Sequence, residues 1–250
     1  MNAFNIAGIL AEQYKVLLID VDPQCNLSDN CGIDDSDPSM LTVREVFENR
    51  VKAQPTLRDV VFESPIEELP NLDVIPSSIM LFMAERQLIS RDKREEILAG
   101  YIKRNQDEFE KYDYVIIDTN PSMGIININS FYAADSIILT SDISKNSIKG
   151  AELFCALWDE IREEMEKEDN IKALIICNVN KRTVIARDML EYVKDASFSK
   201  DIVYFPYVPS TVRLKDTEVF HKPVNILYPS EPICAIYREL VDSLIKGGSI

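Results

Sequence analysis

Residues 16–28 of the chain read VLLIDVDPQCNLS, and the fold can be inferred outward from here. Four apolar residues follow one another without a polar interruption, and Asp20 and Asp22 come directly after them. A short continuous apolar run predicts a strand that is buried on both faces, as in a parallel sheet. The run therefore favours an α/β fold with both aspartates at the carboxyl end of a buried strand.

Similar apolar runs return along the chain and alternate with stretches of helical spacing. Strands are predicted at residues 16–19, 72–75, 114–117, 136–140, 173–176 and 202–205, and helices at 3–13, 43–48, 79–109, 125–132, 148–168, 186–193 and 233–245. This alternation predicts a doubly wound, mostly parallel sheet with helices on both faces. No linker, repeat or low-complexity segment interrupts the pattern, so residues 1–250 are expected to form one domain.

The charge balance is acidic, with 27 lysines and arginines against 42 aspartates and glutamates, and a net charge of −15. A negative surface repels a phosphate backbone, so the composition lends only weak support to DNA as a partner. Some basic residues gather in one predicted helix, where glutamates stand among them and favour an ordinary solvated face. They are Arg91, Lys93, Arg94, Lys103 and Arg104.

Targeting and cysteine patterns exclude several classes of protein. No apolar run approaches the roughly 20 residues of a membrane-spanning helix, and the N-terminus has no secretory pattern, so no membrane partner is expected. The five cysteines are scattered without CxxC spacing, which favours neither a zinc site nor a disulfide framework. Reduced cysteines in a cytoplasmic protein are the simplest interpretation.

Polar side chains follow several predicted strands. Asp20 and Asp22 follow the first strand, Asp118 ends another, and Asn178 follows a third. Ligands of parallel α/β sheets bind beyond the carboxyl ends of the strands, and Mg²⁺ favours one or two carboxylates together with phosphate oxygens. These positions predict a Mg²⁺ site, and acidic residues that simply end strands at solvent are an equally good interpretation.

Four longer segments carry a family resemblance. They are VLLIDVDPQCNLS at 16–28, VIPSSIMLFMAE at 74–85, YDYVIIDTNPSMG at 112–124 and VPSTVRLKDTEVFHKPV at 208–224. In chain order they resemble motifs of the ParA/Soj partition ATPases, and residues 2–13 are similar to the helix that follows the P-loop in that family. The resemblance covers nearly the whole chain. It implies a P-loop NTPase-like fold, the cofactors Mg²⁺ and ATP, and a ParB-like partner protein.

The resemblance also implies a role for each matching residue. Asp22 matches the carboxylate that orients the attacking water, in a class where catalysis depends on positioning and electrostatics. Asp118 matches the Walker B carboxylate that holds Mg²⁺ through water, and Asp20 lies near the same metal shell. Asn178 and the stretch from Pro209 to Asp216 match regions that contact the adenine.

The phosphate-binding motif of the family does not occur in these 250 residues. The family begins with a strand and a KGGxGKT loop, whose backbone N–H groups and lysine hold the phosphates. No GxxxxGKS/T pattern is present, and the sequence opens at Met1 about where that loop would end. The chain as it stands is therefore expected not to hydrolyse ATP. The strand that carries Asp118 is also expected to lack a neighbour on one side, leaving backbone groups unpaired.

Smaller departures occur inside the matching motifs. Cys25 and His221 replace usual glycines, Asn120 replaces a usual proline, and Ser210 and Thr211 replace an arginine and an asparagine. His221 is the only histidine. Nothing near it in the sequence forms a catalytic triad or a metal-binding spacing, so it is expected at the surface.

Two hypotheses for the function are left open, and with them the question of whether the chain is an enzyme. In the first, the native form has the P-loop and the present chain starts late. The protein is then a Mg²⁺-dependent, ParA-like ATPase that acts in ATP-dependent partitioning or positioning of DNA or another cargo, and dimerises around nucleotide. The three retained aspartates favour it. In the second, the chain is a degenerate scaffold or interaction protein without turnover. The departures at Cys25 and Asn120 and the acidic surface favour this second hypothesis.

Overall fold

The structure is a computed structural model that describes residues 1–34, 39–48, 54–180, 183–195, 203–204 and 207–250. The chain divides into two compact units, residues 1–133 with 214–227 and residues 134–213 with 228–250. Each unit has its own sheet and its own apolar core. The prediction of one domain over residues 1–250 stays a prediction.

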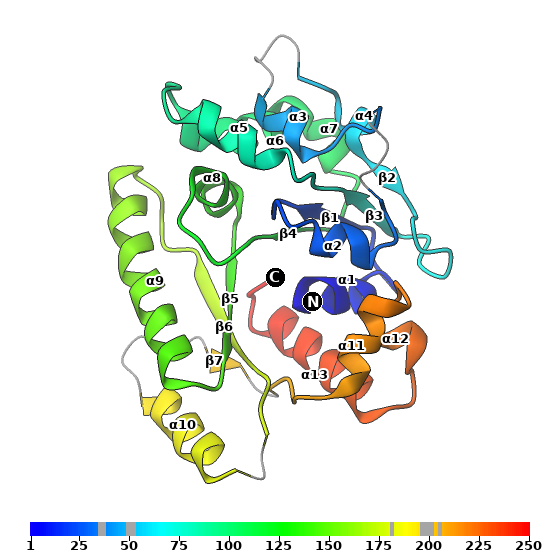
Figure 1. Ribbon diagram of the computed structural model, residues 1–250, viewed down its shortest axis with the longest axis vertical. Coiled ribbons are helices and arrows are strands. Elements are labelled where there is room, and N and C mark those ends of the chain that lie inside the picture. The colour runs from blue at the N-terminus through cyan, green and yellow to red at the C-terminus, as the bar shows by residue number, and fades with distance from the viewer. Residues whose placement is uncertain (35–38, 49–53, 181–182, 196–202, 205–206) are drawn as a thin grey trace. The chain divides into compact units, whose positions relative to one another are not determined.

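The first unit contains a four-stranded sheet in the order β2-β3-β1-β4 (Figure 1). Its strands are β1 (Val16–Asp20), β2 (Phe62–Glu63), β3 (Leu72–Ile75) and β4 (Tyr114–Asp118). β1 runs parallel to β3 and β4, and the short β2 is antiparallel to β3. Every residue of β1 is fully buried, as its continuous apolar run requires. The predicted α/β fold with a mostly parallel sheet is confirmed.

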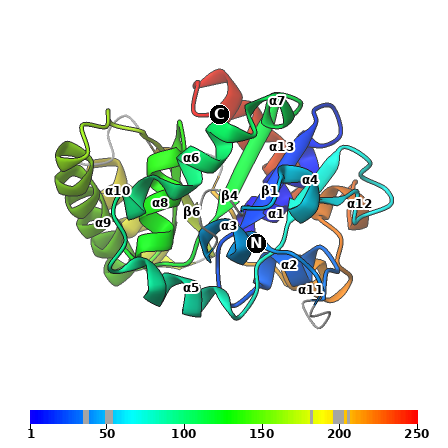
Figure 2. The same ribbon diagram turned by 90° about the horizontal axis from the view of Figure 1, so that it is seen from above.

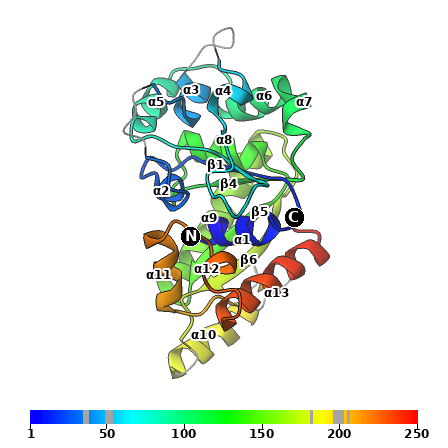
Figure 3. The ribbon, with the colours of Figure 1, turned by 90° about the vertical axis from the view of Figure 1, so that its right-hand side faces the viewer.

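Helices cover both faces of this sheet. Its helical elements are α1 (Asn2–Leu10), α2 (Asn26–Asn30), α3 (Val43–Glu48), α4 (Leu57–Val60), α5 (Leu81–Leu88), the 3-10 turn η2 (Arg94–Glu96), α6 (Ile97–Arg104), α7 (Gln106–Phe109), α8 (Ile125–Ala133) and α12 (Val224–Leu227), and α11 (Val212–Val219) begins at the boundary between the units. Figure 1 and Figure 3 show α3 to α6 on one side of the sheet and α1 with α12 on the other. In the described residues, no helix combines the length and apolar character needed to cross a membrane.

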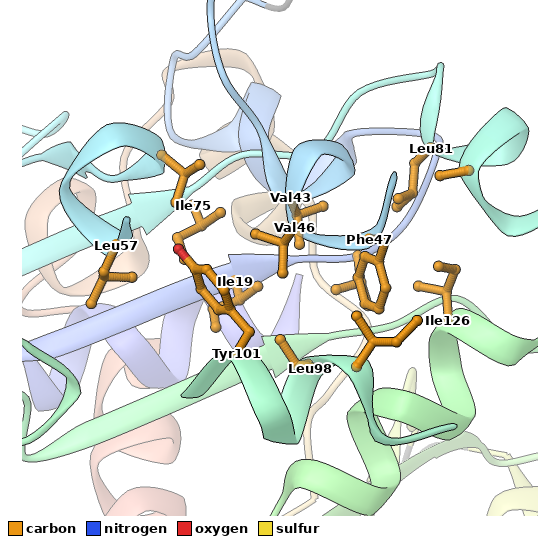
Figure 4. Close-up of a cluster of buried hydrophobic side chains, with 14 of the residues drawn as sticks. Ile19, Val43, Val46, Phe47, Leu57, Ile75, Leu81, Leu98, Tyr101 and Ile126 are labelled. Carbon is orange, nitrogen blue, oxygen red and sulfur yellow. The ribbon is translucent and has the colours of Figure 1, made fainter. Parts of the chain in front are cut away.

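The larger apolar core lies between the sheet and helices α3 to α6. Figure 4 shows Ile19 and Ile75 of the strands in one cluster with Phe47 and Tyr101 of the helices. The ring of Tyr101 also stands edge-on to Phe109, with 6.1 Å between the ring centres. Burial of one such side chain contributes about 1.5–3 kcal/mol. The cluster therefore anchors β1 and β3 and holds their carboxyl ends in place.

The opposite face of the sheet is covered by α1, which the segment around α12 holds in place. Asn5 Oδ1 accepts a hydrogen bond from the backbone N–H of Val224 at 2.9 Å, and Asn225 Nδ2 donates to the carbonyl oxygen of Gly8 at 2.9 Å. A side-chain carbon on Gly8 would lie 2.6 Å from the ring of Pro223, so only glycine allows this close approach.

The single helix predicted over residues 79–109 is wrong. That range contains α5, η2, α6 and α7 as separate elements. Lys93 adopts a left-handed backbone with φ of 52°, which a helix interior does not accommodate. The side chain of Asn129 then caps α6, since its Oδ1 accepts hydrogen bonds from the N–H groups of Ile97 at 2.8 Å and Leu98 at 3.1 Å. The local sequence does not reveal this cap, because Asn129 lies in another helix.

The second unit contains a parallel sheet in the order β5-β6-β7. Its elements are β5 (Ile137–Asp142), α9 (Lys145–Glu164), β6 (Ile171–Cys177), α10 (Val184–Asp195), β7 (Val203–Tyr204) and α13 (Pro232–Lys246). Figure 2 shows α9 and α10 on one side of β6 and α13 on the other. Trp158 of α9 is fully buried and donates to Asn170 Oδ1 at 2.9 Å, which fixes α9 beside the start of β6. The ends of the strand predicted at 202–205 lie outside the described residues.

The strand that carries Asp118 lies at an edge of the first sheet. Among the described strands, β4 pairs with β1 alone, and the side chain of Val115 is 37% exposed. Within the described residues this agrees with the expectation that the strand of Asp118 lacks a neighbour on one side.

Replacing Asn129 by alanine is expected to lower the free energy of unfolding by about 3 kcal/mol, because buried N–H and carbonyl groups lose their partners. Asn129 is fully buried, and its Nδ2 also donates to the carbonyl oxygens of Arg94 and Ile125 at 2.6 and 2.8 Å. Urea unfolding measures the change. Asn26→Ala removes an exposed asparagine of the same unit and is the control, with an effect within about 0.5 kcal/mol. Equal effects of the two substitutions would contradict the cap.

Candidate functional site

The register of β1 and β4 brings predicted site residues together. Asp20 and Asp118 are direct partners across the two parallel strands, at the carboxyl end of each. Asp22 follows β1 by two residues, and the N–H of Val21 donates to the carbonyl oxygen of Asp118 at 3.0 Å. The structure thus gathers Asp20, Asp22 and Asp118 at one end of the first sheet.

Asp20 is fully buried, and both of its carboxylate oxygens accept hydrogen bonds from the loop that follows. Oδ1 accepts from the N–H of Asp22 at 3.0 Å, and Oδ2 accepts from the N–H and the hydroxyl of Ser28 at 2.9 and 2.7 Å. Burial raises the pKa of Asp20 to about 6, although the Ser28 hydrogen bonds act in the opposite direction. Asp20 therefore shapes the loop that carries Asp22, and its oxygens are already engaged.

Asp22 and Asp118 are both half-buried and retain acceptor capacity. Asp22 Oδ1 accepts from the N–H of Gln24 at 2.9 Å, and no described residue donates to the side chain of Asp118. Burial raises the pKa of Asp118, the positive charge of the N-terminal ammonium acts in the opposite direction, and the negative charge of Asp22 raises that pKa further. Within the described residues no lysine or arginine side chain forms an ion pair with Asp20, Asp22 or Asp118. The three carboxylates therefore have no lysine or arginine partner among the described residues.

The donor chemistry of this site fits Mg²⁺. In the part of the chain that the structure describes, no three His, Cys, Asp or Glu side chains are arranged to hold a metal ion by themselves. Mg²⁺ does not require such a cage, since it commonly binds one or two carboxylates and completes its shell with water and phosphate oxygens. Asp22 and Asp118 supply oxygens of that kind. The phosphate side has no matching motif, because the sequence contains no GxxxxGKS/T pattern.

The predicted adenine-contacting residues fall in different units. Asn178 follows β6 in the second unit, where its Nδ2 donates to Asp142 Oδ1 at 2.7 Å. Pro209 lies close by, because its neighbour across a parallel bridge is Val179. Asp216 belongs to α11 and to the first unit. The structure brings Asn178 and Pro209 together, and the adenine role of all three residues stays a prediction.

Sequence reasoning missed Asp142 and Asn127. Asp142 ends β5 as Asp118 ends β4, but Thr140 and Ser141 separate it from the apolar residues of that strand, so the apolar run did not point to it. Asn127 is buried, and its Nδ2 lies 2.8 Å from both the carbonyl oxygen and Oδ1 of Asn120 and 2.8 Å from the carbonyl oxygen of Ser122. The departure at Asn120 therefore has a partner, and the pair shapes the loop after β4.

Two departures from the family pattern occur at left-handed backbone positions. Cys25 has φ of 57° and His221 has φ of 52°, a region in which glycine has no steric cost. His221 is exposed, as expected, and its ring Nδ1 is within hydrogen-bonding distance of the carbonyl oxygen of Asp29. A backbone requirement therefore explains why the family pattern has glycine at both places.

Comparison with known proteins defines the class. The AAA domain family matches residues 1–173, and the chain belongs to that family. The chain is 27% identical over 237 residues to the sporulation initiation inhibitor protein Soj of Bacillus subtilis, covering 94% of this chain and 87% of Soj. It is 29% identical over 245 residues to the chromosome partitioning protein ParA of Myxococcus xanthus, covering 98% of this chain and 82% of ParA. Within the AAA domain family, the chain belongs to the ParA/Soj-like partition ATPases.

Solved structures agree in fold. The apo form of McdA from Cyanothece has a TM-score of 0.83 at 22% identity and covers 98% of this chain and 92% of McdA. Cobyrinic acid a,c-diamide synthase of Mycobacterium smegmatis, solved with an ATP analogue and magnesium, has a TM-score of 0.76 at 24% identity and covers 98% of this chain and 89% of the synthase. Nucleotide and magnesium binding therefore occur among proteins that share this fold.

Asp20 should make stability depend on pH in a defined direction. Its pKa is about 6 in the folded chain against an ordinary value of 3.8, so the unfolded chain binds fewer protons between these values. The contribution of Asp20 to the free energy of unfolding is therefore fully present below about pH 4. It falls by roughly 3 kcal/mol as the pH rises through about 6. Asp20→Asn should remove this dependence of the free energy of unfolding on pH. Urea unfolding across that pH range measures it, and exposed Asp107→Asn is the control. A difference between wild type and Asp20→Asn that does not change with pH would contradict the burial effect.

Cys25→Gly is expected to raise the free energy of unfolding by about 1 kcal/mol relative to Cys25→Ala. Alanine removes the thiol and keeps the left-handed strain, whereas glycine removes both, at some entropic cost in the unfolded chain. Thermal or urea unfolding of the two variants checks the difference. Equal stability would show that the left-handed backbone at Cys25 carries no strain.

Proposed function

We propose that this chain acts in nucleotide-dependent positioning of a cargo, with the carboxylates at the ends of β1 and β4 serving a Mg²⁺-bound phosphate group. The pairing of Asp20 with Asp118, with Asp22 beside them, supports this proposal most directly. Carboxylates that lie close together repel one another, and a divalent cation removes that repulsion.

Each aspartate has its own part in this proposal. Asp118 would hold Mg²⁺ through water, and Asp22 would orient the attacking water. Asp20 does not bind the metal directly in this proposal. It positions Asp22 through the hydrogen bond that it accepts from the N–H of Asp22. When bound, Mg²⁺ supplies positive charge that neutralises the phosphate oxygens. Asn178 and the stretch from Pro209 to Asp216 contact the adenine.

The proposal includes a ParB-like partner protein and a homodimer that forms around nucleotide, both on the basis of the family. DNA is a weakly supported cargo, since the net charge is −15. The cysteines of the described residues are free, which supports a reducing, cytoplasmic location.

A scaffold without turnover is the second candidate. The departures from the family pattern at Cys25 and Asn120 and the acidic net charge of −15 favour it. It requires a stable fold and a protein partner, and it requires neither Mg²⁺ nor nucleotide.

Magnesium binding is tested first on the chain as it stands. Mg²⁺ at about ten times its dissociation constant should stabilise the wild type by about 1.4 kcal/mol, and Asp118→Asn should abolish that gain. Thermal unfolding with increasing Mg²⁺ measures it, and Asp142→Asn, at the matching strand end of the second unit, is the control. A gain that persists in Asp118→Asn, or one absent from the wild type, argues against this metal site.

Hydrolysis is tested on a chain preceded by the first strand and KGGxGKT loop of Soj. Mg²⁺-dependent release of phosphate from ATP should appear, and Asp22→Asn should lower its rate by about 100-fold or more, because the attacking water loses its acceptor. Asp107→Asn, which removes an exposed carboxylate of α7, serves as the control. Failure of the extended wild type to hydrolyse ATP would contradict the ATPase proposal and favour the scaffold.

A further inference from the structure

Ser28 lies in α2, just behind the carboxylates, and is 1% exposed. Its hydroxyl donates to Asp20 Oδ2 at 2.7 Å and accepts a hydrogen bond from the N–H of Ser77 at 2.9 Å. Ser77 belongs to the loop that joins β3 to α5 and is itself fully buried. One hydroxyl therefore touches both the carboxylate that shapes the Asp22 loop and the backbone of a second loop.

We infer that Ser28 is a positioning residue that joins the Asp22 loop to the β3–α5 loop, so that the two loops move as one unit. The hydrogen-bonding capacity of a serine hydroxyl supports this inference. A hydroxyl has one proton to donate, and Asp20 takes it, which leaves a lone pair for the N–H of Ser77. The two contacts therefore fix the orientation of the hydroxyl.

The N–H of Ser77 has no substitute acceptor at hand. Ser28 Oγ is the acceptor that it contacts, and Ser77 Oγ itself is buried with no hydrogen-bond partner among the described residues. A buried N–H that loses its acceptor is costly. Loss of the Ser28 hydroxyl therefore affects the second loop directly, 49 residues further along the chain.

Each loop has a further hydrogen bond near the strand that it follows. Asp20 Oδ1 holds the N–H of Asp22 at 3.0 Å, and the carbonyl oxygen of Pro76 accepts from the N–H of Val43 at 2.9 Å. The second loop then leads into α5, whose start exposes Ile79, Met80, Phe82 and Met83. The hydrogen bonds that start at Asp22 therefore end at Ser77, two residues before this apolar surface begins. The consequence for catalysis rests on the proposed function, but the link between the loops does not.

Amide hydrogen exchange of the full chain tests the link without metal or nucleotide. In Ser28→Ala, exchange should rise about tenfold in both 21–31 and 76–81, the change expected for losing one hydrogen bond to a charged group. Ser28→Thr keeps the hydroxyl and should restore protection in both segments. Ser77→Ala removes a side chain without a partner and should change neither. Ser130→Ala removes another buried serine of the same unit and controls for general destabilisation.

A rise confined to 21–31, or a uniform rise like that of Ser130→Ala, would overturn the inference. If Ser28→Ala does not fold, amide exchange of the wild type still tests the link between the two loops. The amide protons of Ser28 and Ser77 should then open with the same free energy across a urea series, and separate values would overturn the link.

The effect on turnover is measured separately. In the chain extended by the Soj strand and loop, Ser28→Ala should lower kcat about tenfold at unchanged KM, and Ser28→Thr should restore kcat. An extended wild type without hydrolysis contradicts the proposed function, whereas the exchange result alone decides whether the loops are linked.

Discussion

The buried carboxylate of Asp20 is the constraint on which the site depends. A carboxylate without access to water must have a partner for each oxygen, or it loses its charge. The loop after β1 supplies those partners by folding back, so that Asp22 and Ser28 point their N–H groups at Asp20. Residues 21–28 therefore follow a path that provides the buried carboxylate of Asp20 with hydrogen-bond donors. The same path fixes the position of Asp22.

The two ends of the first sheet differ in whether their buried carboxylates have an ion-pair partner. At the amino end, Lys15 forms an ion pair with buried Asp73 at 2.7 Å, and the hydroxyl of Tyr112 donates to the same carboxylate at 2.9 Å. That end is neutralised from within the chain and serves stability. At the carboxyl end, Asp20 and Asp118 are paired by register without any described ion-pair partner. Carboxylates without an ion-pair partner are consistent with the Mg²⁺ site proposed above.

Apolar runs were enough to locate β1, β3 and β4 almost to the residue, because each strand is short and continuously apolar. They did not reveal β2, whose two residues are exposed and pair only through the backbone. The carboxylates were predictable because strand ends in a parallel sheet meet at one edge. The contributions of Ser28, Asn127 and Asn129 were not predictable, since each depends on a side chain that meets a backbone group from another part of the chain.

The open edge of β4 gives this molecule a surface through which it can associate with other chains. Along its outer side, the backbone groups of residues 114–118 have no sheet partner among the described strands, and exposed Val115 offers an apolar contact beside them. A bare strand of this kind is a template on which further strands assemble. Because these backbone groups have no sheet partner among the described strands, we expect association of the chain through β4 to increase with its concentration.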